Sequence, residues 1–415
     1  MKKLLKSRLV GNILSLLVLQ GSNYLFPLLT FPYLVRTLGT ENYGVLVFCV
    51  AIMQFLNIFA DYGFNISGTR DIAVNKQDKD KVNDIYNVIL TIKLIFTLLV
   101  GIVYIIVIET LPFFNDHKVA YLLSFLILIG NSLFPIWLYQ GLERMKYMTY
   151  MNIVVKILVT IFIFVFIRST VDIDLAVFLQ TLYFILPGII SIFFVKLKFH
   201  IDYTFITDIR KLAGELVKGR HVFLTNLWIN FYNQGPLVLV GFLSGNIAAG
   251  HFGIGQKIMG AFYGLSQPVT QAVYPHICEL YDSKKEEFHR FKKKFIWISS
   301  MLSLLISILL FVFSSQLVAF VVGKPSDTVT RLIQLFSLIV FLAIMNTVMA
   351  RIMYAMNLQN VLNKSYVMAA FAFALLSVPF TIWLQEFGMA LVVIVAEGIV
   401  FLLNIRNLKR QKEAI

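Results

Sequence analysis

The chain has 415 residues, of which 59% are hydrophobic and only 14% are charged, and its mean hydropathy is +0.80. A soluble domain has about 45–50% apolar and about 25% charged residues, so this composition excludes an ordinary soluble protein. The formal net charge of +14 is not accompanied by a nucleic-acid-binding module, and nucleic acid is not an expected partner.

Long apolar runs, nearly free of charge, follow one another along the chain. A helix needs about 20 mostly apolar residues to cross the hydrocarbon core of a bilayer. The runs of the first half cover residues 9–35, 42–60, 85–108, 119–140, 147–167 and 175–195. Those of the second half cover the first part of 221–250, then 251–274, 295–323, 332–356, 365–385 and 387–405. The sequence therefore predicts an all-α integral membrane protein with about twelve transmembrane helices.

The basic residues indicate which way the chain is oriented. Most of the Lys and Arg residues between the runs lie in every second connection, and short basic connections stay on the cytoplasmic side. The opposite set of connections holds only Arg36, Lys118, Arg168, Lys324 and Arg331. The basic N-terminus leads into a long run without a cleavage pattern, so we expect a retained first span rather than a signal peptide. Both termini are expected in the cytoplasm.

The longest cytoplasmic connection divides the chain near its middle. Ile209, Leu212 and Leu216 recur there at helical spacing, with Lys211 and Lys218 on the other side, which is typical of an amphipathic helix on the membrane surface. We therefore expect an N-terminal bundle of six helices over residues 1–200, a linker helix over 201–220 and a C-terminal bundle of six over 221–415.

A weak sequence similarity between two segments, one in each half, is consistent with an internal repeat. Pro27 and Pro32 precede the segment Leu38 to Gly44, and Pro236 precedes the segment Leu243 to Gly250. Both segments join the first helix of a half to the second, and repeated halves are common among transporters. A glycine-rich turn between two spans could also arise independently.

The sequence offers little for covalent chemistry. Cys49 and Cys278 are the only two cysteines, and a disulfide framework is not expected. We find no zinc, nucleotide or nucleophile motif of the familiar kinds, and no connection is long enough for a catalytic domain of ordinary size. We expect no catalytic residue, no metal, no cofactor and no enzymatic activity.

Four basic residues lie inside the predicted spans: Lys93, Lys156, Lys257 and Arg351. A charge at the centre of a bilayer costs from about 3 to more than 10 kcal/mol unless it is paired or faces water. Long cationic side chains can also reach the headgroups, and for Lys257 and Arg351 this alternative stays open. For Lys93 and Lys156, which lie deeper, we favour a water-filled cavity and a role in binding.

Further polar residues lie at the same depth. Glu397 is near the middle of the last span, where a short carboxylate cannot reach the surface, and it is a candidate for ion coupling. Asn23 lies in the first span, and Asn230 and Asn233 share one face of the seventh. These amides are candidates for a cavity lining, with hydrogen bonding between helices as the alternative.

Two segments carry a family resemblance. The first is QGSNYLFPLLTFPYLVRTLG at residues 20–39, followed by Asn42-Tyr43-Gly44. The second is Asp61-Tyr62-Gly63-Phe64-Asn65, followed by Ser67 and Thr69-Arg70. The sequence resembles the O-antigen flippases of the Wzx type, in the polysaccharide transporter branch of the MOP superfamily that also includes the MATE drug exporters. These motifs cover about the first 75 residues, and the remainder agrees in length and layout.

The resemblance implies a MATE-like pair of six-helix bundles and a specific cargo. Such a flippase moves undecaprenyl-pyrophosphate-linked O-antigen or polysaccharide repeat units from the cytoplasmic to the periplasmic leaflet of the bacterial inner membrane. The intramembrane cations would then offset the charge of the diphosphate in a central cavity during alternating access. Membrane lipid, a proton or sodium counter-ion and the polysaccharide polymerase machinery are further candidate partners, and Asp61 joins Glu397 as an ion-coupling candidate.

Two other classes of protein stay open. One is an ion-coupled MATE-like exporter, although residues 9–35 lack the acidic residue that many drug exporters carry in the first helix. The other is a membrane-embedded polysaccharide polymerase or glycosyltransferase, which usually has a large periplasmic loop that this chain lacks. A channel is the least favoured, because no repeated pore loop is visible.

Overall fold

The computed structural model describes residues 2–413; the side chains of residues 2–17, 20, 24, 225, 228–229, 265, 267–268, 271–272 and 410–413 lie outside the description. Within this range the chain is helical and contains no strand. The first half comprises α1 (Lys2–Asp61), α2 (Phe64–Asn75), α3 (Lys79–Thr110), η1 (Pro112–His117), α4 (Lys118–Leu133), α5 (Ile136–Gly141), α6 (Met145–Phe166), η2 (Thr170–Asp172), α7 (Ile173–Phe194) and η3 (Val195–Phe199). The second half comprises α8 (Ile209–Ser283), α9 (Lys285–Val312), α10 (Ser314–Val322), α11 (Asp327–Ala355) and α12 (Gln359–Glu413).

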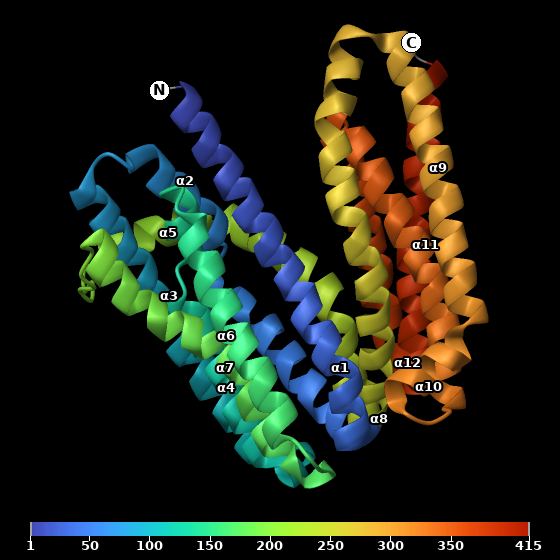
Figure 1. The fold of residues 1–415 in the computed structure, drawn as a ribbon, viewed down its shortest axis with the longest axis horizontal. Helices are drawn as coiled ribbons and strands as arrows, with labels where there is room; N and C mark the ends of the chain where they lie inside the picture. Colours follow the sequence, from blue (N-terminus) through green and yellow to red (C-terminus); the bar gives the residue numbers. More distant parts are fainter. Residues whose placement is uncertain (1, 414–415) are drawn as a thin grey trace. The chain divides into compact units, whose positions relative to one another are not determined.

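Nine stretches of the described chain are long and apolar enough to cross a membrane. Three of them, Gly21–Asp61, Asn230–Gly264 and Gln359–Lys409, have 41, 35 and 51 residues, whereas one crossing needs about 20. Each of the three contains a single residue with a non-helical backbone, and Figure 1 shows α1 turning back at such a break. Each therefore supplies two crossings, which confirms the predicted all-α membrane fold with about twelve spans.

The three breaks are residues with positive φ. Gly39 has φ 78° and ψ 167°, and Gly245 has φ 84° and ψ −179°, a region that glycine enters without the steric cost of a Cβ atom. The third break, Gln385, has φ 52°. Gly39 and Gly245, which lie in the two similar segments of the predicted repeat, thus adopt the same backbone conformation. Each lies at the turn between the first and second spans of its half.

By internal contacts the chain forms two compact units, Met1–Gly235 and Pro236–Ile415. The predicted division at residues 201–220, like the cytoplasmic placement of the termini, stays a prediction. Residues 201–208 are not helical, and α8 then begins at Ile209 and continues unbroken to Gly245.

Within the first unit the start of α8 is tied to α3 by an ion pair. Lys211 Nζ lies 2.8 Å from Asp84 Oδ1, and this carboxylate raises the pKa of Lys211.

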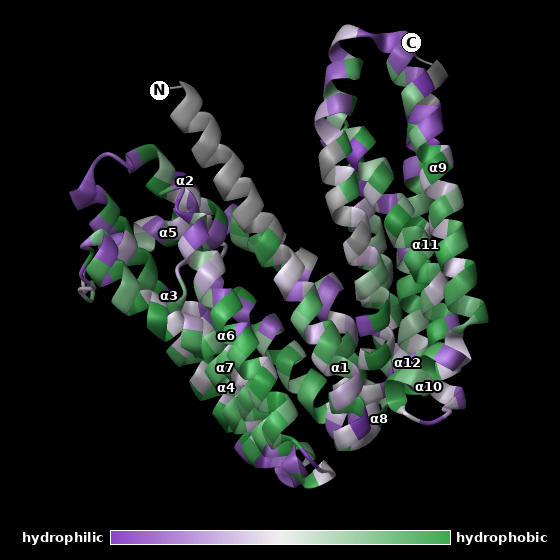
Figure 2. Ribbon diagram, viewed as in Figure 1, coloured by the Kyte–Doolittle hydropathy of each residue, from purple (hydrophilic) through white to green (hydrophobic). Residues whose placement is uncertain are grey.

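Each unit has its own apolar core. In the first unit Phe64, Tyr86 and Trp137 are buried together with Leu138, and in the second Met349, Met353 and their neighbours pack around Phe288. Large apolar side chains also point outward along the spans, and α9 is the extreme, with only 17% of its apolar window buried. Figure 2 shows hydrophobic residues along the middle of the helices and hydrophilic ones at their ends, as lipid contact requires.

Candidate functional site

Lys93 and Asp61 are brought together inside the first unit. Lys93 Nζ lies 3.1 Å from Asp61 Oδ1 and donates a second hydrogen bond, 3.3 Å long, to the carbonyl oxygen of Asn131. The lysine side chain is 2% exposed and the aspartate side chain 10%. The pair joins α3 to the end of α1. Since the positive charge is neutralised within the protein, Lys93 is poorly placed to bind an anion in this conformation.

The turn that follows Asp61 explains the rest of the Asp-Tyr-Gly-Phe-Asn motif. Tyr62 and Gly63 have φ of 48° and 82°, so the chain reverses between α1 and α2. The ring of Tyr62 stacks on Phe223 of α8, with centroids 4.6 Å apart and planes 10° apart. A Cβ atom at Gly63 would lie 2.7 Å from Val222 Cγ1. Phe64 is fully buried. The motif therefore fixes α1, α3 and the first part of α8 to one another.

Lys156 has different surroundings from Lys93. Its Nζ contacts Oδ1 of Asn23, which joins α6 to α1 and brings together two of the residues predicted from sequence. Lys156 is 8% exposed, and none of the ion pairs of the described residues includes it. Thr160, one turn along α6, lies 2.9 Å from the hydroxyl of Tyr183 on α7. The described contacts thus give Lys156 a neutral amide as its partner and no carboxylate.

The two predicted amides of the seventh span, Asn230 and Asn233, differ in their surroundings. Asn230 Nδ2 donates a 2.9 Å hydrogen bond to the carbonyl oxygen of Asn226 in its own helix, and Asn233 is exposed. Among the described contacts, no hydrogen bond joins either amide to Lys93, Lys156 or Asn23. Both therefore stay candidate lining residues.

Three predicted residues lie in the second unit. The guanidinium carbon of Arg351 lies 5.9 Å from the ring centroid of Tyr274, and Lys257 is exposed. Glu397 Oε2 accepts a 2.6 Å hydrogen bond from Asn346 Nδ2, so the carboxylate in the last span is held by a neutral amide. Glu397 and Arg351 both act electrostatically on Tyr366, so these two predicted residues have a common neighbour in the second unit.

Sequence reasoning missed a buried pair in the second unit. His251 Nδ1 lies 2.8 Å from Glu386 Oε1, and the side chains are 16% and 5% exposed. The second oxygen, Glu386 Oε2, is buried and has no hydrogen-bond partner among the described residues. His251 and Glu386 each lie within six residues of a break, at Gly245 and Gln385. Their position at the ends of apolar runs suggested connection residues rather than a buried contact.

Comparison with known proteins relates the whole chain to membrane transporters. Residues 9–281 match the family described as polysaccharide biosynthesis protein. The chain is 32% identical over 408 residues to a protein of Escherichia coli (strain K12) named "Putative O-antigen transporter", covering 97% of this chain and 98% of the relative. A protein of Shigella dysenteriae with the same name is 26% identical, covering 96% and 99%.

Two solved structures share the fold. One is the lipid II flippase MurJ in an inward closed conformation, with a TM-score of 0.70, 12% identity and coverage of 96% of this chain and 87% of that chain. The other is an inward-facing multidrug resistance transporter of the MATE family of the MOP superfamily, with a TM-score of 0.61, 16% identity and coverage of 97% and 99%. At these identities the likeness concerns the fold alone.

Proposed function

Because the chain belongs to the polysaccharide biosynthesis protein family, we propose that it is a flippase for lipid-linked polysaccharide units rather than an enzyme. Its cargo is an undecaprenyl-pyrophosphate-linked O-antigen or polysaccharide repeat unit, which moves from the cytoplasmic to the periplasmic leaflet of the bacterial inner membrane. The similarity to the Escherichia coli protein named as an O-antigen transporter, which extends over 97% of the chain, carries this proposal.

The position of Lys156 supports an anionic cargo such as a diphosphate. A diphosphate loses favourable hydration when it enters an apolar region, and the loss is large unless a cation and hydrogen-bond donors replace the water. Lys156 supplies a cation beside Asn23 and has no carboxylate in ion-pair contact among the described residues. Lys93 is already paired with Asp61. We therefore rank Lys156 first among the four intramembrane cations, and Lys257 and Arg351 stay further candidates.

The mechanism that we propose is alternating access. Sugars cannot cross hydrocarbon unaided because their hydroxyl groups would lose hydrogen bonds to water, so the headgroup moves through a polar, cationic path while the polyprenyl chain stays in lipid. Asp61 and Glu397 stay candidates for coupling to a proton or sodium ion. Asp61 could take that role only by exchanging its contact with Lys93.

A deletion strain tests the proposed function. Loss of the gene should leave lipid-linked repeat units in the cytoplasmic leaflet and remove the surface polysaccharide, and the wild-type gene on a plasmid should restore it. Normal surface polysaccharide in a deletion strain without a second flippase would contradict the proposal. Accumulation of single translocated units would instead favour a polymerase, and loss of drug efflux with normal polysaccharide would favour a MATE-like exporter.

A further inference from the structure

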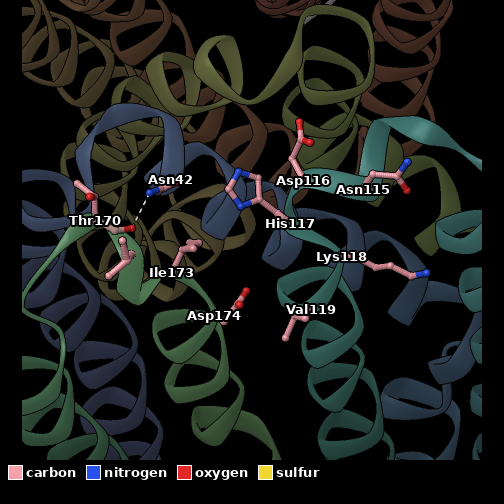
Figure 3. Close-up of a pocket in the computed structure, with 10 residues that line it drawn as sticks. Asn42, Asn115, Asp116, His117, Lys118, Val119, Thr170, Ile173 and Asp174 are labelled. Carbon is pink, nitrogen blue, oxygen red and sulfur yellow. Dashed lines mark hydrogen bonds between the residues drawn. The ribbon is translucent and has the colours of Figure 1, made fainter.

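A polar pocket lies at one end of the first unit. Its volume is about 420 Å³, within the range of roughly 300–1,000 Å³ that is usual for small-molecule sites. Three connections meet there: the turn after Gly39, the segment η1 and the segment η2 with the start of α7 (Figure 3). These are the three connections of the first half that the distribution of basic residues places on the periplasmic side.

The polar side chains of the pocket have few partners within the protein. Asn42 Nδ2 donates a 2.7 Å hydrogen bond to the carbonyl oxygen of Thr170, and this bond fixes two of the connections to each other. Asp116, His117 and Asp174 line the pocket, and no hydrogen bond or ion pair of their side chains occurs within the part of the chain that the structure describes. His117 and Asp174 are only partly exposed, so these groups can bind a ligand at little cost in lost internal contacts.

The charge of the pocket excludes a phosphate as the preferred ligand. Asp116 and Asp174 contribute two carboxylates, and the nearby cation, Lys118, is 2.5 Å from Glu109 Oε2 and is already neutralised. Figure 3 shows the Lys118 side chain extending away from His117 and Asp174. An anion would be repelled here, whereas hydroxyl and amine groups can donate hydrogen bonds to the carboxylates.

The remaining lining combines the amide of Asn115 with aliphatic side chains. Val119 and Ile173 border the pocket, and Ile173 is buried. A combination of carboxylates, an amide and an imidazole with aliphatic side chains suits a ring that carries hydroxyl groups on its edges and C–H groups on its faces. We propose that this pocket is a binding subsite for an uncharged or amino-substituted sugar of the transported oligosaccharide. The inference rests on the proposed function and assigns the sugar part of the cargo a contact separate from that of its diphosphate.

The test measures protection of a cysteine in the pocket. In full-length protein with Cys49→Ala and Cys278→Ser, Val119→Cys introduces a thiol at an exposed lining position, since Val119 is 54% exposed. Leu111→Cys serves as the control, because Leu111 is 43% exposed on the same connection but does not line the pocket. Intact spheroplasts are treated with a membrane-impermeant maleimide, with or without the oligosaccharide that mild acid releases from the strain's own lipid-linked units.

We expect the oligosaccharide to slow labelling at Val119→Cys at least threefold and to leave Leu111→Cys unchanged. Asp174→Asn in the Val119→Cys background should abolish most of the protection, whereas Asp202→Asn, at an exposed position outside the pocket, should not. Equal labelling with and without oligosaccharide in a variant that still exports polysaccharide would overturn the proposal. So would protection by phosphoethanolamine or calcium in its place, or labelling from the cytoplasmic side only.

Failure of the proposed function gives a different result. In that case the deletion strain keeps its surface polysaccharide and accumulates no lipid-linked unit, whatever happens at Val119→Cys. If export depends on the gene and protection is absent, the flippase function stands and the sugar subsite is wrong. The two readouts therefore separate the two proposals.

Discussion

Lys93 and Asp61 form an ion pair in the interior of the first unit, with the lysine side chain only 2% exposed. Removal of one partner leaves the other as an uncompensated buried charge, which typically costs about 3–5 kcal/mol. Loss of either partner alone should therefore destabilise the first unit, whichever further role Asp61 has in transport.

We expect Lys93→Ala and Asp61→Ala each to lower the thermal unfolding temperature in detergent by several degrees. The double variant Lys93→Met with Asp61→Leu should recover most of the loss, because no charge is then buried. Normal export by the double variant would show that the pair is structural. Loss of export with restored stability would show that the charges also act in transport.

Lys156 gives the sharpest test of the cationic site. Lys156→Ala should reduce export about tenfold or more, because a hydrogen bond to a charged group contributes about 1.5–3 kcal/mol, while protein abundance stays near normal. Lys156→Arg should retain part of the activity. Lys196→Ala is the matched control, since Lys196 is exposed and paired with Asp202 at 3.0 Å. Surface polysaccharide measured against protein abundance is the readout.

Asn23 allows the same charge to be neutralised without removing the lysine. Asn23→Asp places a carboxylate where the amide oxygen contacts Lys156, which imitates the pairing of Lys93 with Asp61. We expect export to fall about as far as in Lys156→Ala. Full export by Asn23→Asp, with unchanged abundance, would show that the net charge at Lys156 does not serve an anionic cargo.

Gly63 and Gly39 form a matched pair for the turn after Asp61. Both have positive φ, but a Cβ atom at Gly63 would approach Val222 to 2.7 Å, whereas at Gly39 it would meet nothing within 4 Å. Gly39→Ala should cost about 1–3 kcal/mol, because φ 78° with ψ 167° is a backbone region essentially confined to glycine. Gly63, at φ 82° and ψ 10°, has a backbone cost of only about 1–2 kcal/mol, but its contact with Val222 should make Gly63→Ala at least as destabilising. Unfolding temperatures of the two variants in detergent give the comparison, and a smaller loss for Gly63→Ala than for Gly39→Ala would argue against close packing at Gly63.

His251 and Glu386 provide a test in the second unit. His251→Ala leaves the carboxylate of Glu386 buried without its partner, which costs about 1–3 kcal/mol or more. His251→Ala with Glu386→Leu should be more stable than His251→Ala alone. Thermal unfolding checks the order of the variants, and a double variant that is no better than the single one would show that Glu386 finds another partner.

The spans could be predicted from the sequence because each depends on local composition. A run of about 20 apolar residues has few alternatives to a membrane helix. The breaks at Gly39 and Gly245 lie in the two segments whose similarity indicated an internal repeat. The sequence-based interpretation placed the boundary of the two bundles at residues 201–220, where the charges are. In the structure α8 continues from Ile209 without a break to Gly245.

The contacts of the site could not be predicted in the same way. Lys93 and Asp61 were both singled out, but as a substrate ligand and an ion-coupling residue, because the pairing of residues 32 positions apart depends on how α1 packs against α3. The same holds for Lys156 and Asn23, which are 133 positions apart. Charge and depth are local properties of a sequence, whereas partners are a property of the packed helices.

The breaks at Gly39, Gly245 and Gln385 each join two helices through a single non-helical residue. Proteases cleave chain that can be extended into their active sites, and exposed flexible loops are the usual sites of nicking and of tolerated insertions. Hairpins this tight offer almost no such chain. Epitope tags and protease sites intended to report topology should therefore be placed in the longer connections, such as residues 201–208, rather than at these three tips.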